Sequence, residues 1–422
     1  MNSRRKFLLA TGAIAAAATV GGCSSTDAKG QDALRFTWWG NAGRAERTQK
    51  AIDGYLSNNS AVKVQTEFMD WTQYWDKLST QMAGGNPPDL LQMSEAYQGQ
   101  YDKGSSLLDL RPMVDDGTMD LSSMAEGSLP ASGPLTAVPW TINMRCALAS
   151  KAALQKAGID PSVDLTTMSW DGYGDFLSNA TDKAGIPASI DPGMYIENFE
   201  LWLHQQGKSL YGDKAAGFTE ADLVAFWKMC RGWAEAKIVT DASTTSKMAN
   251  GGTEVAALVT KAAVIDYRWS SEAVIFGSLG VDDITLLAPP NESGHPGRFQ
   301  HAAMLLSVST KAKNSKAAAE LLTFLVTSPD AAKHLGMERG APASSAAADA
   351  ISGDLKPVEK ALLDYHKSAA GKLHDVPRVV PPGGGEMLTT FIRLYESVAF
   401  GRESLEKCAA DFTQKVTSVA SA

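Results

Sequence analysis

Apolar residues in the first quarter of the chain alternate between a strand-like and a helix-like spacing. Residues 33–38 predict a strand, residues 42–56 a helix with its apolar side chains on one face, and residues 62–68 a second strand. Another helix and a third strand, over residues 89–93, follow. The order of strand, helix, strand, helix and strand is typical of one lobe of a doubly wound α/β fold.

The helix before the third strand is marked by its first residue and by its apolar face. Asp70 predicts the N-cap, because a carboxylate there accepts backbone N–H groups, and Gln73 stands three residues later in the capping-box position. Spacings of four, three and four place four apolar residues on one face: Trp71, Trp75, Leu78 and Met82.

The same alternation returns in the second half of the chain. Strands are expected over residues 262–267, 284–288 and 304–308, and a helix over residues 315–326. Thr219 predicts the N-cap of a further helix with large apolar residues on one face. A second lobe agrees with the length of 422 residues, which is more than one hydrophobic core usually organises.

Shorter segments complete the organisation of the chain. Residues 328–336 predict a short helix with Ser328 as its N-cap and Pro329 as its first residue. Two amphipathic helices are expected near the C-terminus. The Ala/Ser-rich run over residues 341–350 is of low complexity, and we expect a hinge or a surface loop there.

The first residues carry an export signal. Residues 1–6 are positively charged and residues 7–20 are apolar, a run too short to span a bilayer comfortably. Gly21 and Gly22 precede Cys23, and this sequence resembles a lipobox, although Val20 stands where leucine is usual. The resemblance implies that residues 1–22 are removed and that Cys23 carries lipid; an uncleaved helical anchor is the alternative.

A second feature of the same segment concerns the route of export. Residues 3–8, Ser-Arg-Arg-Lys-Phe-Leu, resemble the twin-arginine signal. That signal implies that the protein crosses the membrane already folded. After Cys23 no apolar run approaches 18 residues, so no other segment is expected to span a membrane.

The charge of the chain argues against one class of partner. The formal net charge is −8, and it is −11 from Cys23 onward, because three of the 39 basic residues precede Cys23 and all 47 acidic residues follow it. An acidic chain without a long basic run is not expected to bind nucleic acid, whose phosphates need clustered lysine and arginine.

Cysteine and histidine usage gives little evidence for covalent or metal chemistry. Once Cys23 carries lipid, three cysteines remain, and Cys230 and Cys408 stand in helical patterns beside aromatic residues, which favours buried apolar thiols over a disulfide framework. None of the six histidines is four residues from another. We therefore expect no metal site.

Enzyme motifs are absent or incomplete. The chain has no G-x-S-x-G sequence, and the P-loop-like end at residues 207–209 has Trp202 where the first glycine must stand. The sequence therefore predicts neither a catalytic residue nor a cofactor.

Aromatic and polar residues follow four of the predicted strands. The first strand ends in Trp38, Trp39, Gly40 and Asn41, and the others are followed by Asp70 and Trp71, by Glu95 and Tyr97, and by Arg268 and Trp269. These are carboxyl ends of strands, where ligands of α/β sheets bind. An indole ring can stack on the apolar face of a pyranose, and the polar residues can bind its hydroxyl groups.

Alternative roles exist for several of these residues. Trp38 and Trp39 alternate along a strand, so only one can face the ligand, and we predict that it is Trp39. Asp70 is also explained as a helix cap. Three further tryptophans lie on apolar helix faces and are expected in the core: Trp75, Trp227 and Trp233.

Long stretches of the chain resemble a known family. The most specific are TWWGNAGRAERTQKAI, DWTQYWDKLSTQMAGGNPPDLLQM, GSSLLDL, VSTKAKNSKAAAELLTFLVTSPDAAKHLGMERGAP and RLYESVAFGRESLEKCAADF. They are similar to the solute-binding lipoproteins of ABC sugar importers, the extracellular solute-binding family 1 that includes maltose-binding protein. Residues 151–260 match in order rather than in motif.

The resemblance implies two doubly wound α/β lobes joined by a hinge, the periplasmic-binding-protein type II fold. We expect the following division: residues 1–22 as signal peptide, 23–32 as lipid-anchored linker, 33–144 with 300–340 as the first lobe, and 145–299 with 341–422 as the second.

The resemblance also implies site residues. Asn41 and Arg44 would come from the loop after the first strand, Glu95 and Tyr97 from the loop after the third, and Asn143 would stand near the hinge. Tyr195 and Glu197 lie where the family often has an aromatic and a polar contact.

The second lobe contributes the rest of the implied site. Trp269 matches an aromatic platform of the family, and Arg268 stands before it where neutral residues are frequent. Residues 382–386, with Gly384 at their centre, would close over the ligand. Arg44 and Arg268 leave open an acidic sugar such as a uronate, because guanidinium groups bind carboxylates in a bidentate way.

The function implied is that of a monomeric, non-enzymatic lipoprotein on the extracytoplasmic face of the membrane. It would bind a carbohydrate ligand and pass it to the permease subunits of an ABC transporter. Two alternatives remain: the same fold binding another solute, such as a polyol or a peptide, and a secreted glycoside hydrolase with Asp70 and Glu95 as its carboxylate pair.

Overall fold

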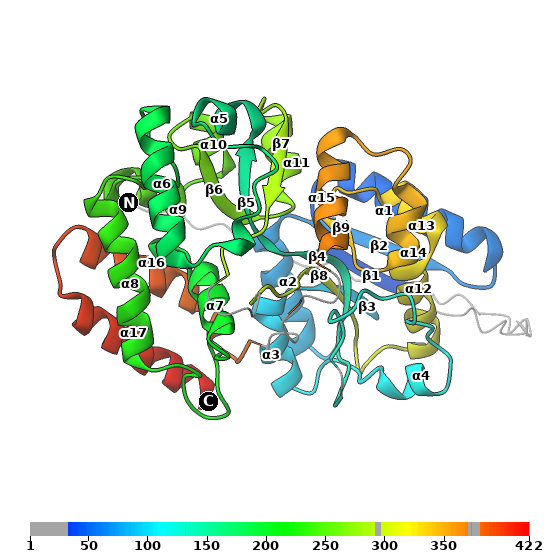
Figure 1. Cartoon of the computed structure of the whole chain (residues 1–422). Coiled ribbons are helices and arrows are strands. Elements are labelled where there is room, and N and C mark those ends of the chain that lie inside the picture. Colours follow the sequence, from blue (N-terminus) through cyan, green and yellow to red (C-terminus); the bar gives the residue numbers. More distant parts are fainter. Residues whose placement is uncertain (1–32, 131, 292–296, 370–372, 374–379, 422) are drawn as a thin grey trace, which may run out of the picture. The chain divides into compact units, whose positions relative to one another are not determined.

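The computed structural model of the chain describes residues 33–130, 132–291, 297–369, 373 and 380–421. The predicted signal peptide and linker, with Cys23, lie outside the described residues. Ala33–Ala422 forms one compact unit. It contains two β-sheets with helices packed against both (Figure 1).

The first sheet has six strands of mixed direction. Its order is β2 (Val64–Met69), β1 (Leu34–Trp39), β3 (Leu90–Met93), β8 (His301–Val308), β4 (Val138–Asn143) and β9 (Ala341–Pro342). β1 is parallel to β2 and β3, whereas β8 is antiparallel to β3 and β4. The carboxyl ends of β1 to β4 and the first residue of β8 therefore lie at the same edge.

Helices with apolar faces bury this sheet. They are α1 (Ala42–Asn58), α2 (Trp71–Ala83), α3 (Glu95–Lys103), α4 (Arg111–Asp115), α12 (Ser315–Thr327), α13 (Pro329–Leu335) and α14 (Ser345–Ile351). One core cluster joins Phe36 and Trp38 of β1, Trp140 of β4 and Leu322 of α12. Side chains from three sequence-distant elements thus share one hydrophobic core.

The second sheet consists of β6 (Ile265–Trp269), β5 (Arg145–Ser150) and β7 (Ile284–Leu287), with β5 antiparallel to both neighbours. The helices of this part are α5 (Lys151–Lys156), α6 (Trp170–Ala184), α7 (Ile196–Gln205), α8 (Glu220–Glu235), α9 (Ala242–Asn250), α10 (Ala257–Thr260), α11 (Glu272–Ser278), α15 (Pro357–Ser368), α16 (Met387–Ala399) and α17 (Leu405–Ala420). The C-terminal helices α16 and α17 pack against each other, and α17 packs against α8 (Figure 1).

The three predicted N-caps, Asp70, Thr219 and Ser328, are confirmed. Asp70 accepts the backbone N–H of Gln73 at 2.9 Å, and Thr219 forms a capping box with Asp222. Ser328 caps α13, which begins at Pro329. Polar groups that satisfy a helix terminus are local in sequence, which is why these starts were predictable.

Three strands were not predicted from the sequence: β4, β5 and β9. β4 and β5 are buried over nearly their whole length, so neither shows the alternation of apolar and polar residues that marks a half-buried strand. Only Met144 separates them, and the chain passes there from the first sheet to the second. The expected lobe boundary after residue 144 falls at this crossing.

The expectation of a hinge or surface loop over residues 341–350 was wrong. Ala341–Pro342 forms β9, which pairs with β4, and Ser345–Ile351 forms α14. Ala343, Ala347 and Ala348 are buried, because small side chains let α14 pack closely on α13. Alanine is also the strongest helix former, which composition alone concealed.

The predicted burial of cysteines and helix-face tryptophans is confirmed. Cys230 and Cys408 are fully buried, as is Cys146, and the three thiols are unpaired. Trp75, Trp227 and Trp233 lie in the hydrophobic cores. Among the described residues, no helix combines the length and the hydrophobicity needed to cross a membrane.

A carboxylate is buried in the core beneath α16. Asp191 is fully buried and accepts hydrogen bonds from the Tyr395 hydroxyl at 2.9 Å and from the Gly193 backbone N–H at 2.8 Å. Burial raises the pKa of Asp191 to about 6. The folded state therefore binds this proton more tightly than the unfolded state, and its contribution to stability is lost as the pH rises through 6.

We predict that Asp191→Asn stabilises the protein at neutral pH. Asparagine keeps an acceptor for both donors but carries no charge. The free energy of unfolding of the variant should therefore rise relative to that of the wild type between pH 4.5 and pH 7.5, by about 2 kcal/mol, which melting curves at each pH would show.

Asp241→Asn serves as the control with the opposite sign. Asp241 caps α9, and the backbone N–H of Thr244 lowers the pKa of its carboxyl. That variant should be least stable relative to wild type above pH 5 and recover as the pH falls. A difference in melting temperature between Asp191→Asn and wild type that stays constant from pH 4.5 to pH 7.5 would contradict the role given to Asp191.

Candidate functional site

Six aromatic rings form one packed group, here called the aromatic cluster, at the carboxyl ends of β1, β2 and β3: Trp39, Trp71, Tyr74, Trp75, Tyr97 and Tyr101. The ring of Trp39 meets Trp71 edge to face at 4.9 Å between centroids, and Tyr97 stacks on Trp75 at 3.9 Å. Trp71 also meets Tyr97 edge to face at 5.9 Å. Residues from α2, α3 and β1 are thus joined at the predicted edge.

Exposure within the aromatic cluster distinguishes its members. Trp71 is 44% exposed, whereas Trp39 is 8% exposed and Trp75 is buried. Trp39 lies against Trp71, Tyr74 and Trp75, so it supports the exposed ring. The sequence predicted that Trp39 would present its ring to a ligand. In the structure the exposed ring at this position is that of Trp71.

Two of the predicted polar residues are helix caps. Asn41 caps α1 and accepts the backbone N–H of Arg44 at 2.9 Å, and Asp70 caps α2. Both are exposed. A helix cap with an exposed side chain keeps free lone pairs, so it can also accept hydrogen bonds from a ligand.

Arg44 is held between a carboxylate and the backbone of β1. Its Nε lies 2.9 Å from Oε2 and 3.0 Å from Oε1 of Glu338, and its Nη1 donates to the carbonyl oxygen of Trp39 at 3.2 Å. Next to Glu338, the buried Arg339 lies with its guanidinium 4.3 Å from the centroid of Trp140. Two arginines and one carboxylate therefore meet beside the aromatic cluster.

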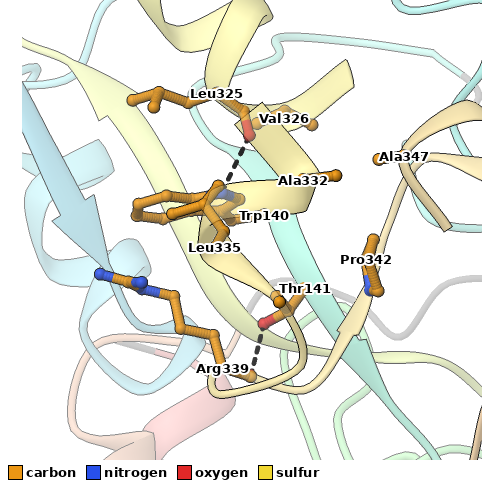
Figure 2. Close-up of a pocket in the computed structure, with 10 residues that line it drawn as sticks. Trp140, Thr141, Leu325, Val326, Ala332, Leu335, Arg339, Pro342 and Ala347 are labelled. Atoms are coloured by element: carbon orange, nitrogen blue, oxygen red, sulfur yellow. Dashed lines mark hydrogen bonds between the residues drawn. The ribbon is translucent and has the colours of Figure 1, made fainter. Parts of the chain in front are cut away.

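Enclosed space near these residues is small. Trp140, Arg339 and side chains of α12 and α13 line a cavity of about 20 Å³, in which Trp140 donates to the Leu325 carbonyl and Thr141 to the Arg339 carbonyl (Figure 2). A water molecule fits, but a sugar does not. A second hollow of about 300 Å³ lies over β1 and β2 and includes none of the predicted site residues.

His301, the first residue of β8, joins groups from both sheets. Its ring stacks on Trp269 at the end of β6, with 4.6 Å between centroids and 23° between planes, and its Nδ1 forms an ion pair with Glu95 of α3. Glu95 also accepts the backbone N–H of Ala302 at 2.6 Å. The Arg145 guanidinium lies 5.3 Å from the centroid of Trp269.

Carboxylates surround His301 on two helices. Glu197 and Glu200 of α7 interact with it electrostatically, together with Glu95. Burial lowers the pKa of His301, but the neighbouring glutamates, Glu95 foremost, together raise it above the usual 6.5. Burial raises the pKa of Glu200 to about 8, and the neighbouring Glu197 and Glu95 add to the rise while His301 opposes it.

Arg268 is neutralised by the protein itself. Its Nε lies 2.9 Å from Asp266, and its Nη1 lies 3.8 Å from Glu272. Its guanidinium lies 5.5 Å from the centroid of Tyr195, whose ring is buried at the start of α7. Arg268 therefore has less positive charge to offer a ligand than its sequence position suggested.

The remaining predicted residues link separate parts of the chain. Asn143 is buried and accepts hydrogen bonds from the Ser270 hydroxyl at 3.2 Å and the Ser271 backbone N–H at 3.1 Å, which connects β4 with the loop after β6. Gly384 is buried against Tyr211, whose hydroxyl lies 3.0 Å from the place of a Cβ atom. The same loop contacts α3, since Val380 lies against Gly99.

Sequence analysis missed His301, Arg145 and Glu338. His301 is the first residue of β8. The amino end of that strand lies at the site because β8 is antiparallel to β3 and β4, and local sequence does not give strand direction. Arg145 belongs to a strand that was not predicted, and Glu338 is brought to Arg44 by a turn nearly 300 residues away. None of these contacts has a signal in local sequence.

Among the described residues, no group of three or more histidine, cysteine, aspartate or glutamate side chains is arranged to hold a metal ion. Asp70 and Glu95, the carboxylate pair considered for glycoside hydrolysis, each have protein partners: the N–H of Gln73 for the first, and Ala302 with His301 for the second. Both carboxylates thus have a positioning role in the fold.

Comparison with known proteins agrees with this architecture. A solved extracellular solute-binding protein of family 1 from Alicyclobacillus acidocaldarius is 26% identical, with a TM-score of 0.77 over 92% of this chain and 98% of that one. A periplasmic oligogalacturonide binding protein from Yersinia enterocolitica is 20% identical, with a TM-score of 0.77 over 92% and 98%. The predicted α/β fold of the periplasmic-binding-protein type II is confirmed.

A curated relative matches over a shorter stretch. The diacetylchitobiose binding protein DasA of Streptomyces coelicolor is 25% identical over 165 residues, which are 37% of this chain and 39% of DasA. The family model for bacterial extracellular solute-binding proteins matches residues 50–360. Because that model covers most of the chain, and the fold agrees with it, the chain belongs to the bacterial extracellular solute-binding proteins.

Proposed function

We propose that this protein captures a sugar or an oligosaccharide outside the cytoplasmic membrane and delivers it to the permease of an ABC importer. The observation that carries the proposal is the aromatic cluster, which presents the half-exposed Trp71 beside charged and amide side chains. An indole face binds the apolar face of a pyranose, and carboxylate, amide and guanidinium groups bind its hydroxyls.

Names of similar proteins support the ligand class. DasA is named for diacetylchitobiose, and the Yersinia protein for oligogalacturonide. The first likeness spans about two fifths of each chain, and the second concerns the fold, so together they support a carbohydrate without selecting one.

We assign the ligand to the residues that gather between the ends of the first-sheet strands and β6. Trp71 and Trp269 would be the stacking surfaces, and the predicted polar contacts would be Asn41, Arg44, Asp70, Glu95, Asn143 and Arg268. Trp39 and Tyr97 would support Trp71, and Tyr195 and Gly384 would shape the second side. The two predicted lobes would meet across this ligand.

The proposal includes a lipid anchor and folded export. Small residues before Cys23 and polar residues after it suit lipid attachment, and Arg4 and Arg5 suit the twin-arginine route. A protein that must stay near its permease gains from a lipid, which holds it at the membrane surface.

A thermal-shift screen against mono- and oligosaccharides tests the binding function. A ligand present at 100 times its Kd stabilises the folded state by about 2.7 kcal/mol, which is a measurable rise in melting temperature. A panel of neutral, acetylated and acidic sugars in which none raises the melting temperature would contradict the proposal.

Trp71→Ala should weaken sugar binding without unfolding the protein. Loss of a central aromatic contact costs about 2 kcal/mol of binding, or about 30-fold in Kd measured by calorimetry. Phe400→Ala is the matched control, since Phe400 is 42% exposed at the end of α16. Unchanged affinity in Trp71→Ala, at an unchanged melting temperature, would remove Trp71 from the site.

Binding of a neutral sugar should strengthen as the pH rises from 6 to 9. A sugar that stacks on Trp269 displaces His301, and the imidazolium–indole contact is worth about 1 kcal/mol. Deprotonation of His301 above its raised pKa removes that cost, so Kd should fall about fivefold.

His301→Gln should abolish this pH dependence, whereas His334→Gln, an exposed histidine of α13, should keep it. Glu95, Glu197 and Glu200 also face His301, and Glu200 titrates near pH 8. A pH dependence that survives in His301→Gln would assign the effect to Glu200 instead.

Cys23→Ser should release the protein from the membrane or leave it as precursor. The variant has no thiol to receive a lipid, so it should leave the membrane fraction on carbonate washing, as judged by immunoblotting. Cys146→Ser, a buried thiol, is the control and should stay anchored. A variant at Cys23 that remains in the washed membranes would exclude the lipoprotein assignment.

A further inference from the structure

Arg44 and Arg339 share a single carboxylate at the carboxyl end of β1. Glu338 is bound to Arg44 through both oxygens, at 2.9 and 3.0 Å, and lies 3.8 Å from Nη1 of Arg339. Arg47 adds a third guanidinium near the same turn, 3.2 Å from the place of a Cβ atom on Gly336. The group therefore carries more positive than negative charge.

Arg339 is the unusual member of this group because it is buried and incompletely paired. It is 4% exposed, and its Nη2 donates to the Thr48 hydroxyl at 2.7 Å, but its Nε and Nη1 have no hydrogen-bond partner. Figure 2 shows its guanidinium beside Trp140, turned away from Ala347 and Pro342. Burial, together with the charge of Arg44, lowers the pKa of Arg339 to about 9.

An uncompensated buried cation is costly to the folded protein. Buried charges in proteins are normally paired, and an unpaired guanidinium N–H forfeits the hydrogen bonds that it makes in water. The N-terminus of α1, a helix of 17 residues capped by Asn41, adds its positive dipole end to the same place. With Glu338 as the one carboxylate described between the two arginines, the local electrostatics favour a further anion.

This group lies next to the proposed sugar-binding surface. Arg44 is bound to the carbonyl oxygen of Trp39, and the ring of Trp39 supports the exposed Trp71. The side chains of Arg44 and Glu338 are 12% and 27% exposed, so solvent reaches them. A sugar ring stacked on Trp71 would bring a ring substituent toward Arg44.

The other charges of the site act on an anion in opposite ways. Arg268 is neutralised by Asp266 and Glu272, and the carboxylates of Glu95, Glu197 and Glu200 gather around His301. Glu95 and Glu197 disfavour a negative group beside His301, whereas the Arg145 guanidinium, 5.3 Å from the centroid of Trp269, favours one. At the other end of the site, Arg44 and Arg339 have one carboxylate, Glu338, between them, which favours an anion there.

We propose that Arg44 forms a subsite for the carboxylate of a uronic-acid residue, with the buried Arg339 behind it adding positive charge and Glu338 as the protein's own anion that the ligand displaces. A planar carboxylate matches the paired N–H groups of a guanidinium, which favours it over a hydroxyl group. This inference rests on the proposed sugar-binding function and deepens it by naming the substrate class.

A matched pair of probes isolates the charge. One is a mixture of di- to tetragalacturonates, and the other is the same mixture after chemical reduction of its carboxyl groups to primary alcohols. Titration calorimetry on the full folded chain measures both affinities for wild type, Arg44→Met, Glu338→Gln and the control Glu403→Gln. Glu403 is an exposed partner of Lys407 at the start of α17. Melting temperatures confirm that each variant is folded.

The expected result is a selectivity change. The wild type should bind the uronates at least about tenfold more tightly than the reduced probes, and less so at high salt. Arg44→Met should lose this ratio, Glu338→Gln should increase it about tenfold because the competing carboxylate is gone, and Glu403→Gln should keep the wild-type ratio.

Three results would overturn the inference. The first is that the wild type binds the reduced probes as tightly as the uronates, or more tightly. The second is that Arg44→Met loses affinity for both probes by the same factor. The third is that the ratio of the two affinities in Glu338→Gln equals that of the wild type. If neither probe binds but neutral sugars of the thermal-shift panel do, this inference alone fails. If no sugar of either set binds, the proposed function fails with it.

Discussion

The edge-to-face packing of aromatic rings at the ends of β1 to β3 is the interaction on which the candidate site depends. Trp39 is fixed between Trp71, Tyr74 and Trp75, and this support lets Trp71 remain half exposed in one position. A rigid aromatic surface loses little conformational freedom on binding, so it is suited to stacking. The same packing places Arg44, through the carbonyl of Trp39, and α3, through Tyr97.

The charged side chains around this surface differ in how completely oppositely charged neighbours neutralise them. Arg268 and its two carboxylates form a closed group, whereas His301 faces three glutamates and Arg44 shares Glu338 with Arg339. In a partly buried site such differences act at short range, where screening by salt is weak. Under the proposed function they would give the two ends of the site different preferences for the charge of a ligand, although the chain as a whole is acidic.

The two sheets are joined at the site by few groups. His301 of β8 stacks on Trp269 of β6, and Asn143 of β4 binds the loop that follows β6. These contacts are polar or aromatic, and they stand beside an apolar cluster that joins Ile142 of β4 with Leu362 of α15 and Leu286 of β7. Under the proposed function, a ligand that stacks on Trp269 would compete with His301, so binding would change one of the contacts between the sheets.

The sequence by itself determined the helix starts, most strands and the family, because caps, periodicity and motifs are local. Asp70, Thr219 and Ser328 start the helices that they predicted. Only the tertiary structure decided which rings are exposed and which charges are paired. Trp39 and Trp71 looked alike in sequence, and His301 and Glu338 had no signal, because the antiparallel direction of β8 and a turn far along the chain bring them to the site.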